Sequence, residues 1–571
     1  MTAVLGISAL YHDAAAALVV DGEVVAAIQQ ERLSRRKNDA SLPKDAALAC
    51  LSLAGLSATD LAAVVFYEDP FARLDRVLLS TLRSFPRAWR QFPHAIRSQI
   101  GSKVWVLDNL AFTLGISRNR VSTVAHHQSH AASAFFASAY DEAAVLTIDG
   151  VGESDTTGLW MGKGSSLECL GTIEFPHSLG LLYAALTAYL GFEVNEGEFK
   201  VMGLAAFGAP KYTQEFSKLI KIREDGSFEL SLSYFAFHTD VDLGFNAKLE
   251  ELLGPRRPRG KPWDLQSSPE DRRYADIAAT LQRFTEDAIV ALAKAAKRLT
   301  SSEFLCMAGG VALNCVANAR VVQESGFKNV FVQPAAGDAG GALGAAYLGY
   351  IQATGKRPAR MRSALLGPSI SNDKARNTAA ALGLKYTEPS DIFDEVAKLV
   401  LDDKIVALAR GRVEWGPRAL GSRSLLASPK QAEMRDRMNR AVKRREPFRP
   451  FAPAVLRSEA HKWFDHWNND LSPYMTGLAI VKPECRAQIA ATTHVDGTAR
   501  IQTVDEDSSP DLCKLLQVMK QRNEAPIMLN TSLNGNGEPI VCDECDALAF
   551  FLSHPIDALV LEDILLQRTS S

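Results

Sequence analysis

Short apolar runs separated by turn residues open the chain. The pattern predicts three β-strands, at residues 4–8, 14–20 and 24–29. Asp21-Gly22 between the last two is a favoured two-residue hairpin turn. A similar unit recurs later, with a strand at 144–148, a tight turn that begins at Asp149 and a returning strand at 158–162. Two such hairpins at corresponding places predict a duplicated fold, each half with one hairpin facing a phosphate.

Helical periodicity alternates with these strands. Residues 42–53 and 275–299 have apolar positions at helical spacing. Short apolar strands are predicted at 303–307 and 330–333, and each is followed by glycines that open a helix. Strands that alternate with helices predict an α/β architecture with parallel or mixed sheets.

A change of composition divides the chain. The sequence turns basic, proline-bearing and irregular between residues 355 and 375. We therefore expect a first domain over 1–355, a linker over 356–375 and a second α/β domain over 376–571. A chain of 571 residues is long enough for such a division.

Composition narrows the class of protein. The 63 basic and 66 acidic residues nearly balance, which argues against bulk nucleic-acid binding. The start MTAVLGISALYHD does not look like a signal peptide, and no apolar run is long enough to span a bilayer. Eight scattered cysteines suit a reducing cytoplasm, and the pair Cys542 and Cys545 is interpreted as structural. The arginine-rich stretch 73–102 is interpreted as a solvated helical arm, with a membrane-covering or acceptor-covering role as the alternative.

Two histidines and two aspartates form a candidate metal set. The histidines are four residues apart at the start of a small-residue helix, so they face one side, although hydrogen-bonded core histidines are the alternative. Each aspartate is predicted to end a strand, where ligands gather in α/β folds. Two imidazoles and two carboxylates suit Fe²⁺, Mn²⁺ or Zn²⁺. Gly309 and Gly310 would let a nucleotide approach the backbone, with tight helix–strand packing as the alternative. The four candidate ligands are His126, His130, Asp149 and Asp338.

A second candidate site is basic. Residues 410–456 combine Arg and Lys with Gly, Pro and aromatic residues. Between residues 435 and 449 there are seven basic side chains and two acidic ones. Because the arginine guanidinium binds phosphate or carboxylate oxygens in pairs, this stretch predicts a pocket for a small anion.

Several long segments carry a family resemblance over essentially the whole chain. The chain resembles the O-carbamoyltransferases of antibiotic and nodulation-factor biosynthesis, typified by the tobramycin carbamoyltransferase. The matching segments stand in the same order as in the family. They include LGISALYHDAAAALV, QQERLSRRKN, HHQSHAASAFF, EFKVMGLAAFG, AGGVALNCVAN, WGPRALGSRSLLA, KRREPFRPFAPAVL and NTSLNGNGEPIV.

The resemblance implies two catalytic domains. The first would have a duplicated fold like that of actin, the sugar kinases and the tRNA threonylcarbamoyl-transfer proteins, and the second would be YrdC-like. The second would make carbamoyl adenylate from carbamoyl phosphate and ATP, with Mg²⁺ accompanying ATP. The first, with Fe²⁺ or another divalent metal such as Zn²⁺ or Mn²⁺, would pass the carbamoyl group to a hydroxyl of a small natural product. We expect a cytoplasmic enzyme that has no nucleic-acid or membrane partner and that can form a homodimer.

The resemblance also implies roles for single residues. The four candidate metal ligands match the iron ligands of the family. Lys37 matches a nucleotide-contacting lysine, and His12 matches a histidine near the acceptor hydroxyl, which could accept its proton. Lys443 is expected to be essential for adenylation. The residues that match the carbamoyl-phosphate and adenylate pocket are Arg418, Lys443, Arg449, Arg500, Asn530 and Ser532. Arg444 departs from the family's usual non-basic residue and should leave the chemistry unchanged.

Three other functions stay open. A sugar kinase would yield ADP rather than AMP and pyrophosphate, and it leaves the basic second domain unexplained. Hydrogenase maturation would carbamoylate a thiolate, but those relatives carry zinc-finger CxxC pairs ahead of these domains, and this sequence has none there. A tRNA-modification or scaffold subunit would bind tRNA at physiological salt, which the near-neutral charge disfavours.

Overall fold

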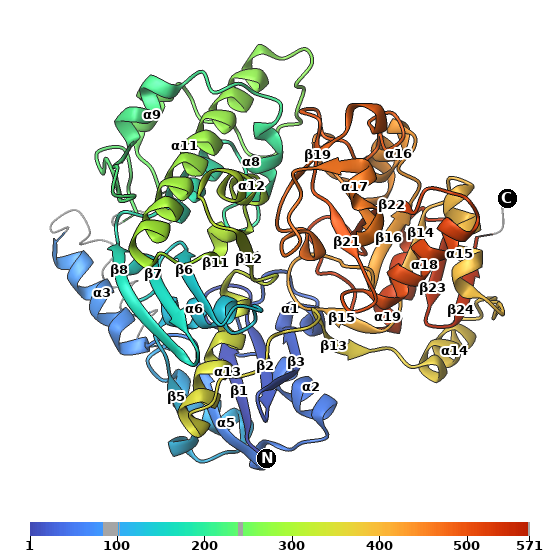
Figure 1. Cartoon of the computed structure of the whole chain (residues 1–571), viewed down its shortest axis with the longest axis horizontal. Helices are drawn as coiled ribbons and strands as arrows, with labels where there is room; N and C mark the ends of the chain where they lie inside the picture. The colour runs from blue at the N-terminus through green and yellow to red at the C-terminus, as the bar shows by residue number, and fades with distance from the viewer. Residues whose placement is uncertain (84–96, 98–100, 102, 238–243, 569–571) are drawn as a thin grey trace. The chain divides into compact units, whose positions relative to one another are not determined.

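The computed structural model describes residues 1–83, 97, 101, 103–237 and 244–568 (Figure 1). By their contacts these residues form two compact units. Unit 1 comprises Met1–Val24, Ala40–Ala47 and Leu56–Arg360. Unit 2 comprises Val25–Asp39, Leu48–Gly55 and Met361–Ser571. The N-terminal segment Val25–Asp39 therefore belongs to the second unit, which the sequence did not indicate, and the predicted domain boundaries stay a prediction.

Two five-stranded sheets repeat one topology. The first has the order β3-β2-β1-β4-β5 and the second the order β8-β7-β6-β11-β12. In each sheet the first strand pairs antiparallel with the next and parallel with a later one, which pairs parallel with the edge strand. The expected duplicated α/β fold is confirmed. The strands are β1 (Ala3–Ser8), β2 (Ala15–Val20), β3 (Glu23–Gln29), β4 (Leu61–Phe66), β5 (Val121–Thr123), β6 (Glu142–Ile148), β7 (Asp155–Lys163), β8 (Ser166–Glu174), β11 (Phe304–Ala308) and β12 (Asn329–Val332).

The predicted hairpin between β2 and β3 is present. Asp21 and Gly22 both have positive φ angles, 49° and 91°. This is the left-handed conformation that a two-residue hairpin turn requires. The predicted strands at 4–8, 14–20 and 24–29 are confirmed within one residue at each end.

Helix α13 (Asp338–Thr354) packs against β1 and against α6 (His126–Phe135). A Cβ atom added at Gly344 would lie 1.7 Å from the backbone oxygen of Ser129. Only glycine permits this approach, which brings the first turn of α6 close to α13. The packing of two helices thus positions the histidines of α6 relative to Asp338.

The remaining helices agree in part with the sequence. The helices predicted at 42–53 and 275–299 are confirmed as α2 (Lys44–Ala54) and α11 (Pro269–Thr300). Other elements are α1 (Gln30–Ser34), α3 (Pro70–Arg83), α5 (Val106–Leu114), α7 (Leu179–Tyr189), α8 (Glu198–Ala205), α9 (Thr213–Leu219), β9 (Ile220–Ile222), β10 (Phe228–Leu230), α10 (Ala247–Leu253) and α12 (Cys315–Glu324). None of the helices in the described residues has the length and apolar character needed to cross a membrane.

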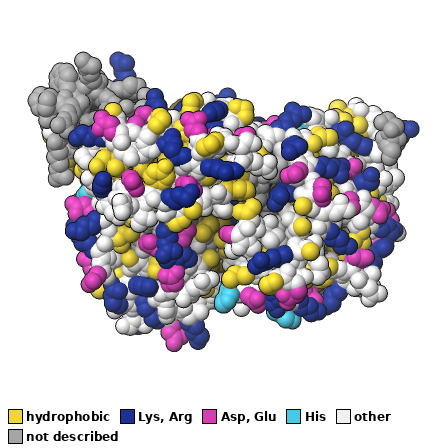
Figure 2. Space-filling model, turned by 90° about the horizontal axis from the view of Figure 1, so that it is seen from above, with side chains coloured by type: hydrophobic (Ala, Val, Ile, Leu, Met, Phe, Trp, Pro, Cys, Tyr) yellow, Lys and Arg dark blue, Asp and Glu magenta, His cyan; other side chains and the backbone are white. Residues whose placement is uncertain are grey.

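The interpretation of residues 73–102 as a solvated arm is wrong at its start. Arg73 is 7% exposed, forms an ion pair with Glu68 and lies over the ring of Tyr11. The rest of that stretch lies largely outside the described residues. On the face seen in Figure 2, basic and acidic side chains are interspersed, as the balanced composition predicts.

Unit 2 is built on a mixed seven-stranded sheet. Its order is β21-β17-β22-β16-β14-β23-β24. Alternate residues of β14 join two separate apolar clusters, so the sheet is covered on both faces. The strands are β14 (Val406–Ala409), β16 (Arg423–Ala427), β17 (Ala452–Leu456), β21 (Gln502–Val504), β22 (Ile527–Ser532), β23 (Ala558–Leu561) and β24 (Ile564–Gln567). One cluster includes α14 (Asn372–Ala381) and α19 (Glu544–Ser553), and the other includes α15 (Ile392–Leu401) and α18 (Pro510–Gln521).

Smaller elements complete this unit. β13 (Leu365–Ser369) lies inside the stretch expected to be a linker and pairs with β15 (Arg412–Glu414). A three-stranded sheet joins β18 (Phe464–Asp465), β19 (Ala479–Val481) and β20 (Thr498–Ala499). Two short helices are α16 (Ala432–Arg437) and α17 (Ala460–Trp463).

Candidate functional site

The four candidate metal ligands meet in unit 1. One ligand atom from each lies within 4.8 Å of the others. The Nε2 atoms of His126 and His130 are 3.1 Å apart, and His126 Nε2 lies 2.9 Å from Asp149 Oδ2. Asp338 Oδ1 lies 3.6 Å from His130 Nε2. Asp149 follows β6 as predicted, but Asp338 is the first residue of α13, so its expected place at a strand end is wrong.

The electrostatics of this cluster fit a divalent ion. Burial by itself lowers the pKa of His126, but the hydrogen bond with Asp149 and the charge of Asp338 raise it to about 9. Burial also opposes protonation of His130, but its hydrogen bonds with Asp149 and Asp338 raise its pKa. Ligand atoms about 2.0–2.2 Å from one ion are about 3–3.5 Å apart, close to the separations found here. A cation would replace the protons that otherwise hold these imidazoles beside two carboxylates.

Neighbouring groups hold the candidate ligands. The Tyr67 hydroxyl donates to Asp338 Oδ2 at 3.3 Å, and the backbone N–H of Gly310 donates to Asp149 Oδ1 at 3.0 Å. Glu153 accepts a hydrogen bond from the backbone N–H of His126 at 2.9 Å. His127 points elsewhere, as predicted, toward Thr147 and the backbone oxygen of Asp155.

Gly309 allows two backbone segments to approach closely beside the candidate metal ligands. Its φ angle is 91°, and an added Cβ would lie 2.2 Å from the backbone oxygen of Ile148. We expect Gly309→Ala to lower the free energy of unfolding by about 2–4 kcal/mol, because backbone strain and a backbone clash act together. Urea unfolding measures this change. Gly171→Ala is the control, since an added Cβ there meets nothing within 4 Å; an equal loss in both variants would contradict the prediction.

His12 lies in the loop between β1 and β2. Its Nδ1 is 3.1 Å from Asp13 Oδ2, and its side chain is 22% exposed. Burial alone lowers the pKa of His12, but Asp338 and Asp13 outweigh it and raise the pKa to about 10. A cation between Asp149 and Asp338 would offset that carboxylate charge and lower the pKa again.

Lys443 is the centre of the basic site in unit 2. Its side chain is buried, and Nζ donates to the backbone oxygens of Ser532 and Asn534 and to Asn534 Oδ1 at 2.9 Å. Burial, followed by the charges of Arg445 and Arg449, lowers the pKa of Lys443 well below its ordinary value. Lys443 and Ser532, both expected in the anion pocket, therefore lie in contact, and their role in the pocket stays a prediction.

Two arginines, Arg445 and Arg449, lie near this lysine, and Arg500 lies near both of them. Burial and the charges of Arg449 and Arg500 lower the pKa of Arg445 well below its ordinary range. Burial and the charge of Arg500 also lower the pKa of Arg449, although Glu446, whose carboxylate lies 3.6 Å from Arg449 Nη1, opposes this shift. Basic side chains that lower one another's pKa indicate a place where a bound anion would be stabilised.

Two other predicted pocket residues, Asn530 and Arg418, are connected to this region through the seven-stranded sheet. Asn530 is 1% exposed and pairs with Leu426 of β16 and Ala452 of β17. Its Nδ2 donates to the backbone oxygen of Ala419 at 3.2 Å, which fixes the backbone beside half-buried Arg418. Lys37 stands apart from these contacts. Its Nζ forms an ion pair with Glu31 at 2.9 Å, within the N-terminal segment of unit 2.

Four site residues were missed from the sequence. Arg445 and Asn534 lie two residues after Lys443 and Ser532, so a paired spacing along the two segments was available as a signal. Tyr67 and Glu153 follow strands but belong to no pattern that indicates metal support. Only the folded chain places them against Asp338 and His126.

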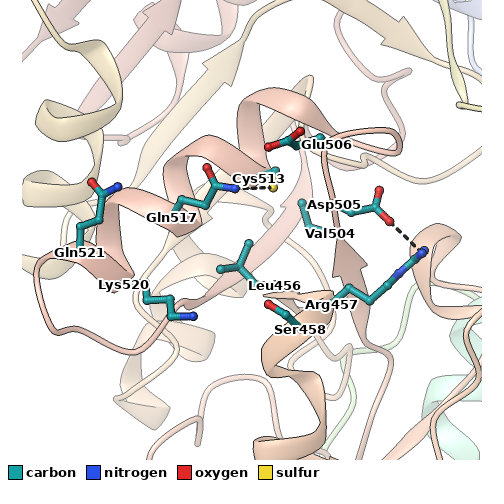
Figure 3. Close-up of a pocket in the computed structure, with 10 residues that line it drawn as sticks. All are labelled: Leu456, Arg457, Ser458, Val504, Asp505, Glu506, Cys513, Gln517, Lys520 and Gln521. Carbon is teal, nitrogen blue, oxygen red and sulfur yellow. Dashed lines mark hydrogen bonds and ion pairs between the residues drawn. The ribbon is translucent and has the colours of Figure 1, made fainter.

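A surface cavity lies at the opposite end of the sheet in unit 2. It measures about 750 Å³ at the carboxyl ends of β17 and β21, beside α18 (Figure 3). β22 runs antiparallel to β17, so Ser532 lies at the other end. The cationic side chains are already paired, Arg457 with Asp505 and Lys520 with Glu459, both at 2.8 Å. This cavity contains none of the predicted site residues.

Comparisons with known proteins cover both units. The chain is 42% identical to an uncharacterized protein of Synechocystis sp., over all of this chain and 97% of that protein. It is 34% identical to nodulation protein NolNO of Sinorhizobium fredii, over 98% of this chain and 79% of that protein. The 3'-hydroxymethylcephem-O-carbamoyltransferase of Amycolatopsis lactamdurans is 32% identical over 59% of this chain and 64% of that protein.

Solved structures and family models complete the comparison. The ROK hexokinase of Thermus thermophilus matches 62% of this chain and 100% of its own, at 15% identity and a TM-score of 0.28. The model of the carbamoyltransferase N-terminus matches residues 3–347, and that of the carbamoyltransferase C-terminus matches residues 397–568. The chain is therefore an enzyme of the carbamoyltransferase family.

Proposed function

We propose that this enzyme is an ATP-dependent O-carbamoyltransferase with two reaction sites. Unit 2 would make carbamoyl adenylate from carbamoyl phosphate and ATP, and unit 1 would transfer the carbamoyl group to a hydroxyl of a small natural product. The main support for the proposal is the cluster of Lys443 with Arg445, Arg449 and Arg500. Four basic side chains lie there with few carboxylates near them.

The adenylation step consumes one water. Water releases phosphate from carbamoyl phosphate, and an oxygen of the resulting carbamate attacks the α-phosphorus of ATP as pyrophosphate leaves. Both reactants are anionic at neutral pH, so the cationic cluster offsets their repulsion, by a few kcal/mol for each close charge pair at an effective dielectric of about 20. Asn530 and Ser532 supply an amide and a hydroxyl that orient the carbamoyl group.

The transfer step takes place on the acceptor hydroxyl. Its oxygen attacks the carbamoyl carbon, the bond to the AMP phosphate breaks, and His12 accepts the hydroxyl proton. The four converging ligands would hold a divalent ion, which when bound stabilises negative charge on the phosphate. Fe²⁺, Zn²⁺ and Mn²⁺ all suit two imidazoles and two carboxylates. His12 must be neutral for its role, which requires the carboxylate charge beside it to be offset.

Metal binding can be tested without an activity assay. We expect Asp338→Ala to weaken binding of added Fe²⁺, Zn²⁺ or Mn²⁺ by at least about a hundredfold, because it removes a direct ligand, whereas loss of a mere supporting partner costs less. Metal content after dialysis measures the effect. Asp373→Asn is the control, since that carboxylate is 89% exposed; equal metal content in the two variants would remove the assigned site.

Product analysis tests the proposed function as a whole. Incubation with carbamoyl phosphate, ATP and a hydroxylated acceptor should give AMP, pyrophosphate and a carbamate ester. ADP and a phosphorylated acceptor would instead identify a kinase. Acceptors of the aminoglycoside, macrolide and ansamycin classes are the first to try.

A further inference from the structure

We propose that Arg32, in the N-terminal segment of unit 2, is a positioning residue for Arg418 in the carbamoyl-phosphate pocket. The inference rests on the function proposed above. It concerns helix α1 (Gln30–Ser34), which belongs by its contacts to unit 2 although it lies more than 300 residues before Met361–Ser571, the largest part of that unit. Neither the basic stretch nor the candidate metal ligands include this helix.

The contact of Arg32 is short and buried. Arg32 is 1% exposed, and its Nη2 donates to the backbone oxygen of Gly416 at 2.6 Å. Gly416 has a φ angle of 106° and stands two residues before Arg418. Arg32 therefore holds the backbone on the N-terminal side of Arg418.

The backbone on the other side of Arg418 is held separately. Ala419 accepts a hydrogen bond from Asn530 Nδ2, and Leu420 accepts one from Gln502 Nε2 at 2.8 Å. Glu414 Oε1 accepts hydrogen bonds from the backbone N–H groups of three residues that follow, which are Leu420, Ser422 and Arg423. Arg32 and Asn530 thus bracket Arg418, one on each side, and fix the path of the loop from which its guanidinium extends.

Arg35, the residue that follows helix α1, contacts the second loop of the pocket. Arg35 donates to the backbone oxygens of Ile540 and Pro539, at 2.7 and 3.0 Å, and forms an ion pair with Asp546 at 3.2 Å. This loop follows Ser532 and Asn534, the partners of Lys443. Helix α1 and the residue that follows it therefore contact both chain segments that carry the candidate anion-binding residues.

The energetics argue for a role beyond packing. Arg32 Nε and Nη1 are buried and have no hydrogen-bond partner among the described residues. Burial lowers the pKa of Arg32, and the charges of Glu31 and Glu414 offset only part of this effect. A buried cation with so few hydrogen bonds is a poor stabiliser compared with an apolar side chain of similar volume. Its other hydrogen bond, to Gln29 Oε1, is long at 3.5 Å, so the short bond to Gly416 is the contact that a positioning role would use.

A double-mutant cycle tests the inference in the full chain. The assay is carbamoyl-phosphate-dependent exchange of labelled pyrophosphate into ATP. We expect Arg32→Lys to raise the KM for carbamoyl phosphate about tenfold, the effect of one misplaced hydrogen bond, with a smaller change in kcat. In an Arg418→Gln background the same substitution should add less than about a twofold loss, because residues that act through one another are not additive.

Matched variants separate positioning from folding. Arg36→Gln removes an exposed charge four residues further on and should leave the exchange unchanged. If Arg32→Lys lowers the melting temperature, Arg32→Gln replaces it in the assay, because glutamine keeps an amide donor for Gly416. The positioning role is wrong if the losses of exchange activity at Arg32 and Arg418 multiply in the double mutant. It is also wrong if the Arg32 and Arg36 variants lose exchange activity equally. Absence of exchange in the unsubstituted chain would instead remove the proposed function, and this inference with it.

Discussion

Lys443→Ala is expected to abolish carbamoyl-adenylate formation, with a loss of at least about a thousandfold, the scale of removing a preorganised charge from a reaction site. Lys443 Nζ holds the backbone oxygens of Ser532 and Asn534 and the Asn534 amide oxygen. The substitution removes this charge from the pocket. It also leaves buried carbonyl groups without a donor, so the loop that follows β22 loses its anchor.

Labelled pyrophosphate exchange into ATP is the direct measurement for this variant. Arg444→Gln is the matched control, because Arg444 is the next residue, carries the same charge and is exposed. Metal content should be unchanged in both variants, since the candidate ligands lie in unit 1. Exchange at the normal rate in Lys443→Ala would mean that the adenylation pocket is misplaced.

The fold was largely predictable because its pattern is local. Strands β1 and β2 are continuous apolar runs, and Asp21-Gly22 between β2 and β3 is a hairpin signal that needs no tertiary context. The duplication followed from the recurrence of that hairpin at β6 and β7. What the sequence could not show is the membership of Val25–Asp39 in unit 2, because that depends on contacts across hundreds of residues.

The candidate sites were predictable in different ways. The four-residue spacing of His126 and His130 places them on one helix face, and this carries over directly into the structure. Asp338 was predicted for the wrong reason, since it begins α13 instead of ending a strand. Its approach to the histidines depends on the glycine contact between α13 and α6, which no linear pattern reveals. Tyr67, whose hydroxyl donates to Asp338, could not be predicted from the sequence as a site residue for the same reason.

The second large effect is expected at His12. His12→Asn should reduce carbamoyl transfer to the acceptor by about a hundredfold or more, the usual contribution of a positioned general base, and leave pyrophosphate exchange intact. Asparagine keeps a polar group beside Asp13 but cannot accept the hydroxyl proton. Because only a neutral imidazole accepts a proton, the transfer rate of the unsubstituted enzyme should rise as pH passes through the pKa of His12. The variant should lose that dependence.

The outcome at His12 also bears on the metal. With the carboxylates of Asp338 and Asp149 uncompensated, the pKa of His12 is raised to about 10, which keeps the imidazole protonated at neutral pH. Transfer in the presence of added Fe²⁺, Zn²⁺ or Mn²⁺ should therefore reach its plateau at lower pH than in the dialysed enzyme. His461→Asn, the same substitution at an exposed position in unit 2, is the control. Equal loss of transfer and exchange in His12→Asn would show that His12 supports the fold and takes no proton, since the proposed half-reactions use residues of different units.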